Sequence, residues 1–591
     1  MSTRKKRQRK AKAMQAQKTR QVKPAFRLRR HVVLVLMCCT AAALVAGAWY
    51  QQVFRTDFLT QMGQQKHLGY VDIPARRGRV FDRNGEVLAV STPVDSIWAN
   101  PSRLKDDNEA IRAIAGIMGL DNEELFDRIA RHSKRKFLYL DRWLEPQKAR
   151  AIRAKLEARG IKGVGLVREY RRFYPAGAFF AHIIGFAGGD DRGQEGLELQ
   201  YEEKLGAVNG RKLVLRDAKR HLLEDVESIK QPRAGQDLHL SLDRRLQFYA
   251  YRALKKAVRK HKAKSASLVT LDVQTGEVLA MVSQPSFNPN GSRSNKGGRL
   301  RNRAIVDTFE PGSTMKPFTI ATALELGYIT EKTTIDLSKG FIKVGNRTVK
   351  DPKRYGVIDP AGILLKSSNA GSATIALKMP QEKYWQMLDR FGFGHEAGVQ
   401  FPAEARGRLN HFANWATIDH ANLAFGYGIS ASALQLAQAY SIIAADGIRR
   451  PVSLLKVSEP VEGERILSKQ TTVKLRRMME GVVTTEGTAP KAAVSGYRVA
   501  GKTGTVKKLG KNGYEDKKYR SLFAGMAPAT NPRLVTVVVF DEPRGKEYYG
   551  GLVAGPVFSE VMEHALRLLN VKPDSKEAVD GLQMAAVAGA G

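Results

Sequence analysis

The sequence predicts an α+β fold, in which helices pack around an antiparallel sheet, with a β-rich module and one membrane-spanning helix towards the N-terminus. Strand-and-turn patterns flank a helical region in the C-terminal half, and one long apolar run near the start lacks charged residues. At 591 residues the chain is too long for a single core. The predicted parts are a cytoplasmic basic tail (1–30), a transmembrane helix (31–53), a support module (54–230), a large domain (235–570) and a disordered tail (571–591).

The membrane-spanning helix is predicted from residues 31–50, HVVLVLMCCTAAALVAGAWY, which contain no Asp, Glu, Lys or Arg. At about 1.5 Å per residue this run reaches about 30 Å, the thickness of the hydrocarbon core of a bilayer. Residues 1–30 hold 13 Lys or Arg and no acidic residue. The positive-inside rule therefore predicts a cytoplasmic N-terminus and an exported remainder, with Trp49 and Tyr50 in the outer interfacial belt.

Two other interpretations of the N-terminal segment compete with the anchor. Ala46-Gly47-Ala48 resembles a signal-peptide cleavage site, but a basic region of 30 residues is far longer than signal peptides carry. A basic tail can also bind nucleic acid. Phe26 is its only aromatic residue, however, and anionic lipid beside a span explains the charge more simply. We expect an inner-membrane anchor and no nucleic-acid partner.

Cysteine and histidine usage limits the chemistry of the exported part. The only two cysteines of the chain, Cys38 and Cys39, lie within the span, so disulfides and thiol chemistry are excluded from the exported part. The stability of the exported part must therefore come from the size of its hydrophobic core. The 11 histidines show no HExxH or other paired-ligand spacing, so neither a metal nor a cofactor is expected.

The support module combines strand and helix patterns. Residues 51–70 are polar and can continue the membrane helix as a stalk. Residues 73–90 place Asn84-Gly85 between alternating apolar positions, which is typical of a hairpin. Residues 104–160 carry apolar positions at helical spacing. The module shows no nucleophile–base pair, which indicates a support or interaction role.

The large domain is predicted to form one sheet from both of its ends. Residues 267–283 contain two strand patterns around Thr275-Gly276, and later strand candidates lie at 521–528 and 534–543. A helix is predicted over 314–326, with Pro317 tolerated in its first turn. Because strands flank the helical region, we expect an antiparallel sheet with helices packed between and around its strands.

The stretch EPGSTMKPF, residues 310–318, places Ser313 and Lys316 three positions apart at the head of an apolar run. Residues i and i+3 share one face of a helix, so Ser313 Oγ and Lys316 Nζ fall within hydrogen-bond reach. A serine becomes nucleophilic when a base takes its proton, and lysine is such a base when burial or another cation lowers its pKa. The pattern alone also fits a serine N-cap followed by a solvated lysine.

Two further short motifs follow in the same domain. The tripeptide SSN (367–369) lies 54 positions after Ser313, and KTGT (502–505) begins 135 positions after Ser367. Alone, the first fits a turn or cap and the second a strand end. The order SxxK, SxN, KTGT within one domain makes chance agreement improbable, so the three motifs are interpreted together.

This triple signature occurs in penicillin-binding proteins and class A β-lactamases. Over about residues 70–570 the chain resembles class B penicillin-binding proteins, the monofunctional D,D-transpeptidases, and most closely their cell-division (FtsI) type. Further similar stretches are IPARRGRVFDRNGEVLA, RFYPAGAFFAHIIGF with GQEGLE, LDVQTGEVLAMVSQPSFNPN and FGYGISASALQLAQAY. The resemblance implies a penicillin-binding transpeptidase fold for 235–570 and a pedestal or dimerisation-like module for 54–230.

The resemblance also implies a role for each motif residue. The implied catalytic residues are Ser313, the nucleophile; Lys316, its base; Ser367, a proton relay; Asn369, which holds Lys316 and the substrate amide; and Lys502, a second cation. The implied substrate contacts are Thr503 and Thr505, which with Lys502 bind a carboxylate; Gly504, which admits the substrate backbone; and the N–H groups of Ser313 and Thr505, which form the oxyanion hole.

The implied function is peptidoglycan cross-linking through a serine acyl-enzyme at the division septum, with the catalytic domain in the periplasm and β-lactams as inhibitors. The implied partners are stem peptides, a polytopic glycan polymerase and other division proteins of the membrane. A β-lactamase, a D,D-carboxypeptidase, a side-wall elongation transpeptidase, and a membrane-bound β-lactam sensor or scaffold are the other interpretations.

Overall fold

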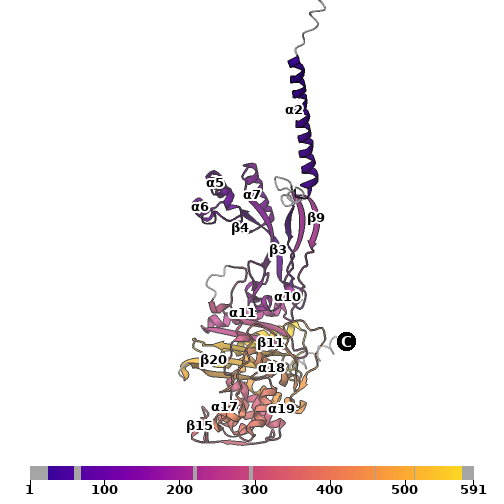
Figure 1. The fold of residues 1–591 in the computed structure, drawn as a ribbon. Coiled ribbons are helices and arrows are strands. Elements are labelled where there is room, and N and C mark those ends of the chain that lie inside the picture. The colour runs from indigo at the N-terminus through magenta and orange to yellow at the C-terminus, as the bar shows by residue number, and fades with distance from the viewer. Residues whose placement is uncertain are drawn as a thin grey trace, which may run out of the picture. The chain divides into compact units, whose positions relative to one another are not determined.

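A computed structural model describes residues 24–58, 68–216, 222–291, 297–459, 461–510 and 513–575 (Figure 1). They form two compact units. The first contains the described parts of Met1–Ile73 and Asn209–Pro232, and the second those of Pro74–Val208 and Arg233–Gly591. The predicted domain boundaries stay predictions, and the predicted tail beyond residue 575 lies outside the described residues.

The first unit contains an apolar helix and a small sheet. Helix α2, Pro24–Trp49, continues into a π-helical turn, Tyr50–Phe54. Within it, Leu28–Phe54 is long and apolar enough to cross a membrane, the one such helix among the described residues. Strands β1 (Leu68–Ile73), β8 (Gly210–Arg216) and β9 (Leu222–Lys230) form an antiparallel sheet in the order β1-β8-β9. The prediction that a helical stalk extends to Tyr70 was wrong for its last residues, because Leu68–Ile73 forms a strand that pairs with β8.

The N-terminal part of the second unit is a mixed sheet with three helices. Its strands are β2 (Val80–Phe81), β3 (Val87–Ala99), β4 (Leu138–Leu144), β5 (Val164–Phe173) and β10 (Leu238–His239). The hairpin predicted at Asn84-Gly85 is confirmed: β2 pairs antiparallel with β3, and Gly85 takes the positive φ of 89° that the turn needs.

Helices α5 (Asn108–Met118), α6 (Asn122–Arg131) and α7 (Pro146–Ala158) occupy most of the region predicted as helical. Asp107 and Asp121 cap the first two, each by accepting a backbone N–H of the first turn. The prediction over 104–160 missed β4, which interrupts the helices because it pairs with β3.

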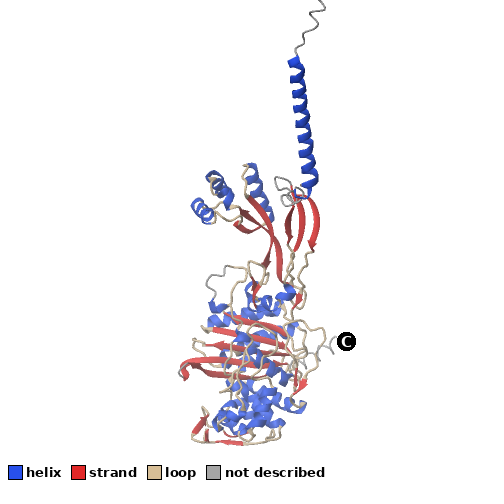
Figure 2. Cartoon of the chain, in the orientation of Figure 1, coloured by secondary structure: helices blue, strands red, loops and turns tan. Residues whose placement is uncertain are grey.

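A five-stranded antiparallel sheet forms the centre of the predicted large domain (Figure 2). Its strands are β11 (Ser265–Asp272), β12 (Val278–Gln284), β19 (Ala500–Gly510), β20 (Gly513–Ala527) and β21 (Leu534–Asp541), in the order β12-β11-β21-β20-β19. This order confirms that strands from both ends of the domain meet in one sheet. Every residue of β11 and β12 is buried, as expected for a sheet that helices cover on both faces.

Helices α11 (Arg244–Lys260) and α21 (Gly555–Leu568) pack together on the sheet, and α18 (Ala433–Ala444) packs on it separately. All residues of α18 are buried, and a capping box between Ser432 and Gln435 starts it. Helix α13 (Lys316–Glu325) packs against both α15 (Asn369–Ala376) and α19 (Lys469–Glu480), and α19 packs against β19.

The remaining short elements are α4 (Pro101–Leu104), α8 (Ala181–Ile184), β6 (Phe186–Ala187), β7 (Gly193–Glu195), α9 (Gly196–Gln200), α10 (Glu202–Leu205), α12 (Arg303–Val306), β13 (Ile335–Leu337), β14 (Phe341–Val344), β15 (Arg347–Lys350), β16 (Gly356–Ile358), α14 (Pro360–Lys366), α16 (Gln381–Arg390), α17 (Thr417–Leu423), β17 (Ile448–Arg449), β18 (Glu464–Arg465) and α20 (Gly550–Val553).

Candidate active site

Ser313 lies in a 3-10 turn, Gly312–Met315, directly before α13. We expected Ser313 and Lys316 on one face of an α-helix. In a 3-10 turn, positions i and i+3 eclipse each other, so the same spacing still places the two side chains together. Lys316 Nζ donates a hydrogen bond to Ser313 Oγ at 2.9 Å.

The turn that carries Ser313 is held from two sides. Gly312 has a φ of 55°, and a Cβ there would lie 2.2 Å from Cγ2 of Val506 on β19, so both conformation and space require glycine. On the other side, the hydroxyl of Tyr440 in the buried helix α18 donates to Thr314 O at 2.8 Å. The predicted nucleophile therefore sits on a preorganised backbone.

Lys316 is fully buried, and its Nζ contacts the SSN motif as well as Ser313. It donates to Ser367 O at 2.5 Å, to Ser367 Oγ at 3.1 Å and to Asn369 Oδ1 at 2.8 Å. Ser367 can turn toward Lys316 because it ends α14 in the left-handed conformation, with φ 58°. Ser368 then caps α15 by accepting the N–H of Gly371.

Lys502, on β19, approaches the same serine. It is fully buried, and its Nζ donates to Ser367 Oγ at 3.0 Å and to Thr503 Oγ1 at 3.3 Å. The two lysines thus converge on the hydroxyl group of Ser367, and Ser313 and Asn369 join the cluster through Lys316 Nζ.

Burial and mutual repulsion set the charge of the two lysines. Burial lowers the pKa of Lys316 well below its usual 10.5, the neighbouring Lys502 lowers it further, and Asp351 acts in the opposite direction. Burial lowers the pKa of Lys502 to about 7. Two ammonium groups on one hydroxyl repel each other, so one lysine is held neutral and can accept a proton.

The KTGT strand makes contacts within the chain besides its predicted contacts with substrate, which stay predictions. A Cβ on Gly504 would lie 3.1 Å from Pro311 O and 3.1 Å from Thr314 Cγ2, so a side chain there would crowd the approach of β19 to the Ser313 turn. Its predicted contact with a substrate backbone stays a prediction. The hydroxyl of Thr505 accepts the N–H of Gly550 at 3.0 Å.

Thr503 is buried, and its hydroxyl lies 2.8 Å from that of Thr488. Thr505 is therefore the more accessible of the two predicted carboxylate contacts. Sequence reasoning missed Thr488, because a threonine in a turn-rich stretch carries no signal of its own.

Asp351, after β15, was also missed. Its carboxylate accepts hydrogen bonds from Ser368 Oγ at 2.5 Å, from the N–H of Asn369 at 2.5 Å and from the N–H of Ala370 at 3.1 Å. It therefore stabilises the first turn of α15, where a negative charge is favourable. A lone aspartate before a proline has no sequence pattern that connects it to the SSN motif.

Asp351→Asn should misalign the SSN motif. The amide keeps the shape but loses the charge, and hydrogen bonds to a charged acceptor contribute about 1.5–3 kcal/mol each. We expect a lower melting temperature and a roughly tenfold slower acylation by benzylpenicillin. The control is Asp336→Asn, an exposed aspartate that accepts the N–H of Ser338. Equal acylation rates for the two variants would contradict the positioning role.

The sheet, the buried helix behind it and the Ser–Lys–Ser–Lys cluster define a serine acyl-transferring protein of the penicillin-binding class. The family model for the penicillin binding protein transpeptidase domain matches residues 266–563, and that for the penicillin-binding protein dimerisation domain matches residues 72–240. The chain belongs to the penicillin-binding protein transpeptidase family.

Similar proteins cover most of the chain. It is 39% identical over 547 residues to the probable peptidoglycan D,D-transpeptidase PbpC of Pseudomonas aeruginosa, covering 92% of this chain and 96% of that protein. It is 39% identical over 542 residues to the peptidoglycan D,D-transpeptidase FtsI of Escherichia coli K12, covering 90% of this chain and 91% of that protein.

Two solved structures are similar in fold. One is the apo transpeptidase domain of Burkholderia pseudomallei penicillin-binding protein 3, with TM-score 0.53 and 43% identity over 57% of this chain and 98% of that chain. The other is a peptidoglycan synthetase of Bifidobacterium adolescentis, with TM-score 0.68 and 26% identity over 86% of this chain and 98% of that chain. The likeness to the second extends beyond the transpeptidase domain.

Proposed function

We propose that this chain is a septal peptidoglycan D,D-transpeptidase, which cross-links stem peptides through an acyl-enzyme on Ser313. The observation that carries the mechanism is the convergence of two buried lysines on Ser367, with one of them also bound to Ser313. The cluster combines a nucleophile, a base and a proton path in one place.

Acylation begins when Ser313 Oγ attacks the carbonyl carbon between the two terminal D-alanines and Lys316 Nζ takes its proton. Backbone N–H groups of Ser313 and Thr505 would stabilise the oxyanion. The C–N bond then breaks, the proton passes by way of Ser367 to the leaving amine, and D-alanine departs. Lys502 and Thr505 would hold the carboxylate of the departing residue.

Cross-linking reverses the proton transfers of acylation, with the amine of a second stem peptide in place of D-alanine. A side-chain amine of a neighbouring stem attacks the ester carbon, a lysine takes the amine's proton, and Ser313 Oγ leaves and regains a proton. The product is an amide between two stems. A β-lactam can take the place of the donor, because its strained amide and its carboxylate resemble the D-alanyl-D-alanine end.

The product distinguishes this function from its competitors. The purified full chain in detergent, supplied with uncross-linked glycan strands and the glycan polymerase that extends them, should yield cross-linked peptide dimers by mass spectrometry. Predominantly trimmed tetrapeptide would identify a carboxypeptidase, and rapid penicillin turnover a β-lactamase. A stable penicillin adduct without either peptide product would identify a sensor. Each of these three results would overturn the proposal.

The anchor, its orientation and the septal location are proposed from the apolar helix α2, the cationic tail before it and the FtsI relative. We expect the span and the module before the transpeptidase domain to contact a polytopic glycan polymerase and other division proteins. A fluorescent protein that matures only in the cytoplasm, fused before Met1, should fluoresce and gather at division septa. Dark cells would contradict the orientation, and side-wall fluorescence would favour an elongation enzyme.

A further inference from the structure

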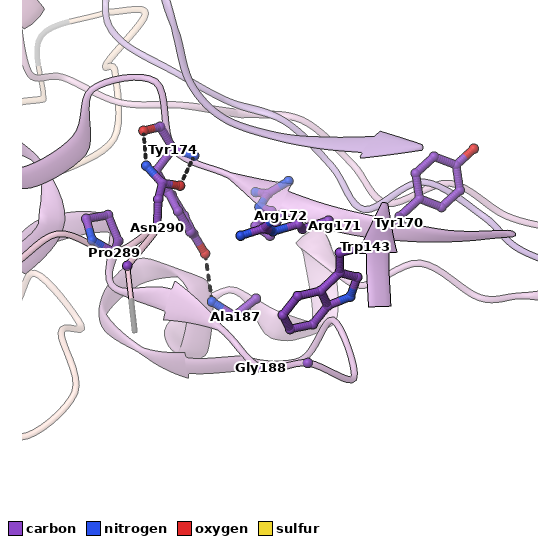
Figure 3. Close-up of a pocket in the computed structure, with 11 residues that line it drawn as sticks. Trp143, Tyr170, Arg171, Arg172, Tyr174, Ala187, Gly188, Pro289 and Asn290 are labelled. Atoms are coloured by element: carbon purple, nitrogen blue, oxygen red, sulfur yellow. Dashed lines mark hydrogen bonds between the residues drawn. The ribbon is translucent and has the colours of Figure 1, made fainter. Parts of the chain in front are cut away.

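A cavity of about 350 Å³ lies in the second unit, and none of its lining residues belongs to the three motifs (Figure 3). It is formed by Trp143, the end of β5 and two loops, 187–189 and 289–291. Its volume lies within the range of roughly 300–1,000 Å³ that small-ligand pockets occupy. A short segment of a ligand fits there, whereas a folded partner domain does not.

Two arginines, Arg171 and Arg172, line this cavity, and none of the lining residues is acidic. Arg172 is 8% exposed; its Nε donates to Glu198 Oε1 at 2.7 Å and its Nη1 donates to Gly78 O at 2.7 Å, but its Nη2 has no hydrogen-bond partner. Nη2 is buried as well as unpaired, which is rare for a hydrogen-bond donor, and Arg172 brings its positive charge to the cavity lining.

Arg171 supplies a second cation to the same cavity. It forms no ion pair with any residue in the described part of the chain, and its guanidinium carbon lies 5.1 Å from the ring centre of Trp143. Arg142 lies 4.9 Å from the same ring. Trp143 holds this position with a φ of 65°, which a bulky side chain rarely adopts.

The facing wall is formed mainly by backbone and is held rigid. Gly188, Gly189 and the loop around Asn290 present peptide groups rather than long side chains. The Asn290 amide is bound at both ends: Oδ1 accepts the N–H of Tyr174 at 2.9 Å, and Nδ2 donates to Tyr174 O at 2.9 Å. The Tyr174 hydroxyl accepts the N–H of Ala187 at 2.7 Å. The cavity is therefore preformed.

We propose that this cavity binds a carboxylate-bearing segment of a peptidoglycan stem peptide as a non-catalytic subsite, an inference that rests on the proposed function. Exposed Arg171 holds the carboxylate, the positive charge of Arg172 in the same lining adds to the attraction, and the glycine-rich wall faces the ligand's amide groups. Binding one stem here keeps the same strand near Ser313, which raises the effective concentration of its other stems at the catalytic cleft.

The test measures the binding of a dye-labelled stem tetrapeptide to the full chain in detergent after benzylpenicillin has acylated Ser313. Blocking the cleft restricts the measurement to other sites. Arg171→Glu should weaken binding at least tenfold without changing penicillin labelling or the melting temperature, because Arg171 is exposed. The control, Arg150→Glu, reverses an exposed charge on α7 outside the cavity and should leave affinity unchanged.

The chemistry of the ligand is tested with the same assay. A tetrapeptide whose carboxylates are converted to amides should bind at least tenfold more weakly, and peptide-free glycan strands should not compete. Equal affinity of Arg171→Glu and the parent chain, equal affinity for the amidated peptide, or no binding at all would overturn the subsite. If penicillin fails to label Ser313 while Arg171-dependent binding persists, the proposed function fails and the subsite stands.

Discussion

Replacing Ser313 by alanine should abolish covalent labelling by penicillin while leaving the chain folded. The substitution removes one oxygen from a partly exposed turn and no core volume. Lys316 Nζ keeps the acceptors Ser367 O, Ser367 Oγ and Asn369 Oδ1 within hydrogen-bond distance. Intact-mass spectrometry after incubation with benzylpenicillin measures the adduct, and peptide mapping locates it in the parent chain.

The control for that experiment is Ser338→Ala, an exposed serine after β13 that should label at the parental rate. An adduct on the Ser313→Ala chain, or a parental adduct mapped to another residue, would overturn the mechanism. A large fall in melting temperature would instead show that the hydroxyl supports the fold, which its partial exposure argues against.

Lys316→Met should lower the second-order rate constant of acylation by about 10²–10⁴, the usual contribution of a general base. Methionine has a similar length and suits a buried position, but it accepts no proton. The melting temperature should fall modestly, because the acceptors on Ser367 and Asn369 lose their donor. Stopped-flow acylation with a chromogenic β-lactam measures the rate, with exposed Lys378→Met as the unaffected control.

The pH dependence of acylation tests the division of roles between the lysines. Lys316 must be neutral to act as base, so the acylation rate should rise with pH as Lys316 loses its proton. This rise should occur at a pH well below 10.5, because the pKa of Lys316 is lowered. Lys502 must be charged to hold the carboxylate, so the rate should fall above its pKa of about 7. Lys502→Arg should remove this alkaline fall, because arginine stays charged. If the rate for Lys502→Arg still falls at alkaline pH as it does for the parent chain, Lys502 is not the group that must stay charged.

The hairpins and the final strands were predictable because their signals are local. Asn84-Gly85 and Thr275-Gly276 lie between alternating apolar residues, and β21 reads as an unbroken buried run. The helical region at 104–160 was less predictable. Its strand β4 has a half-buried sequence, LYLDRWL, that becomes a strand by pairing with β3, a contact distant in the sequence.

The sequence by itself was enough to predict the nucleophile, its base and the two partner motifs, because their order and spacing along the chain are a signature that needs no coordinates. Tertiary structure alone decided what holds them. Asp351 supports the SSN motif and Tyr440 supports the Ser313 turn through contacts that join distant segments. Only the structure buries Lys316 and Lys502 on one hydroxyl, and because desolvation and repulsion depend on that placement, their lowered pKa values are properties of the fold.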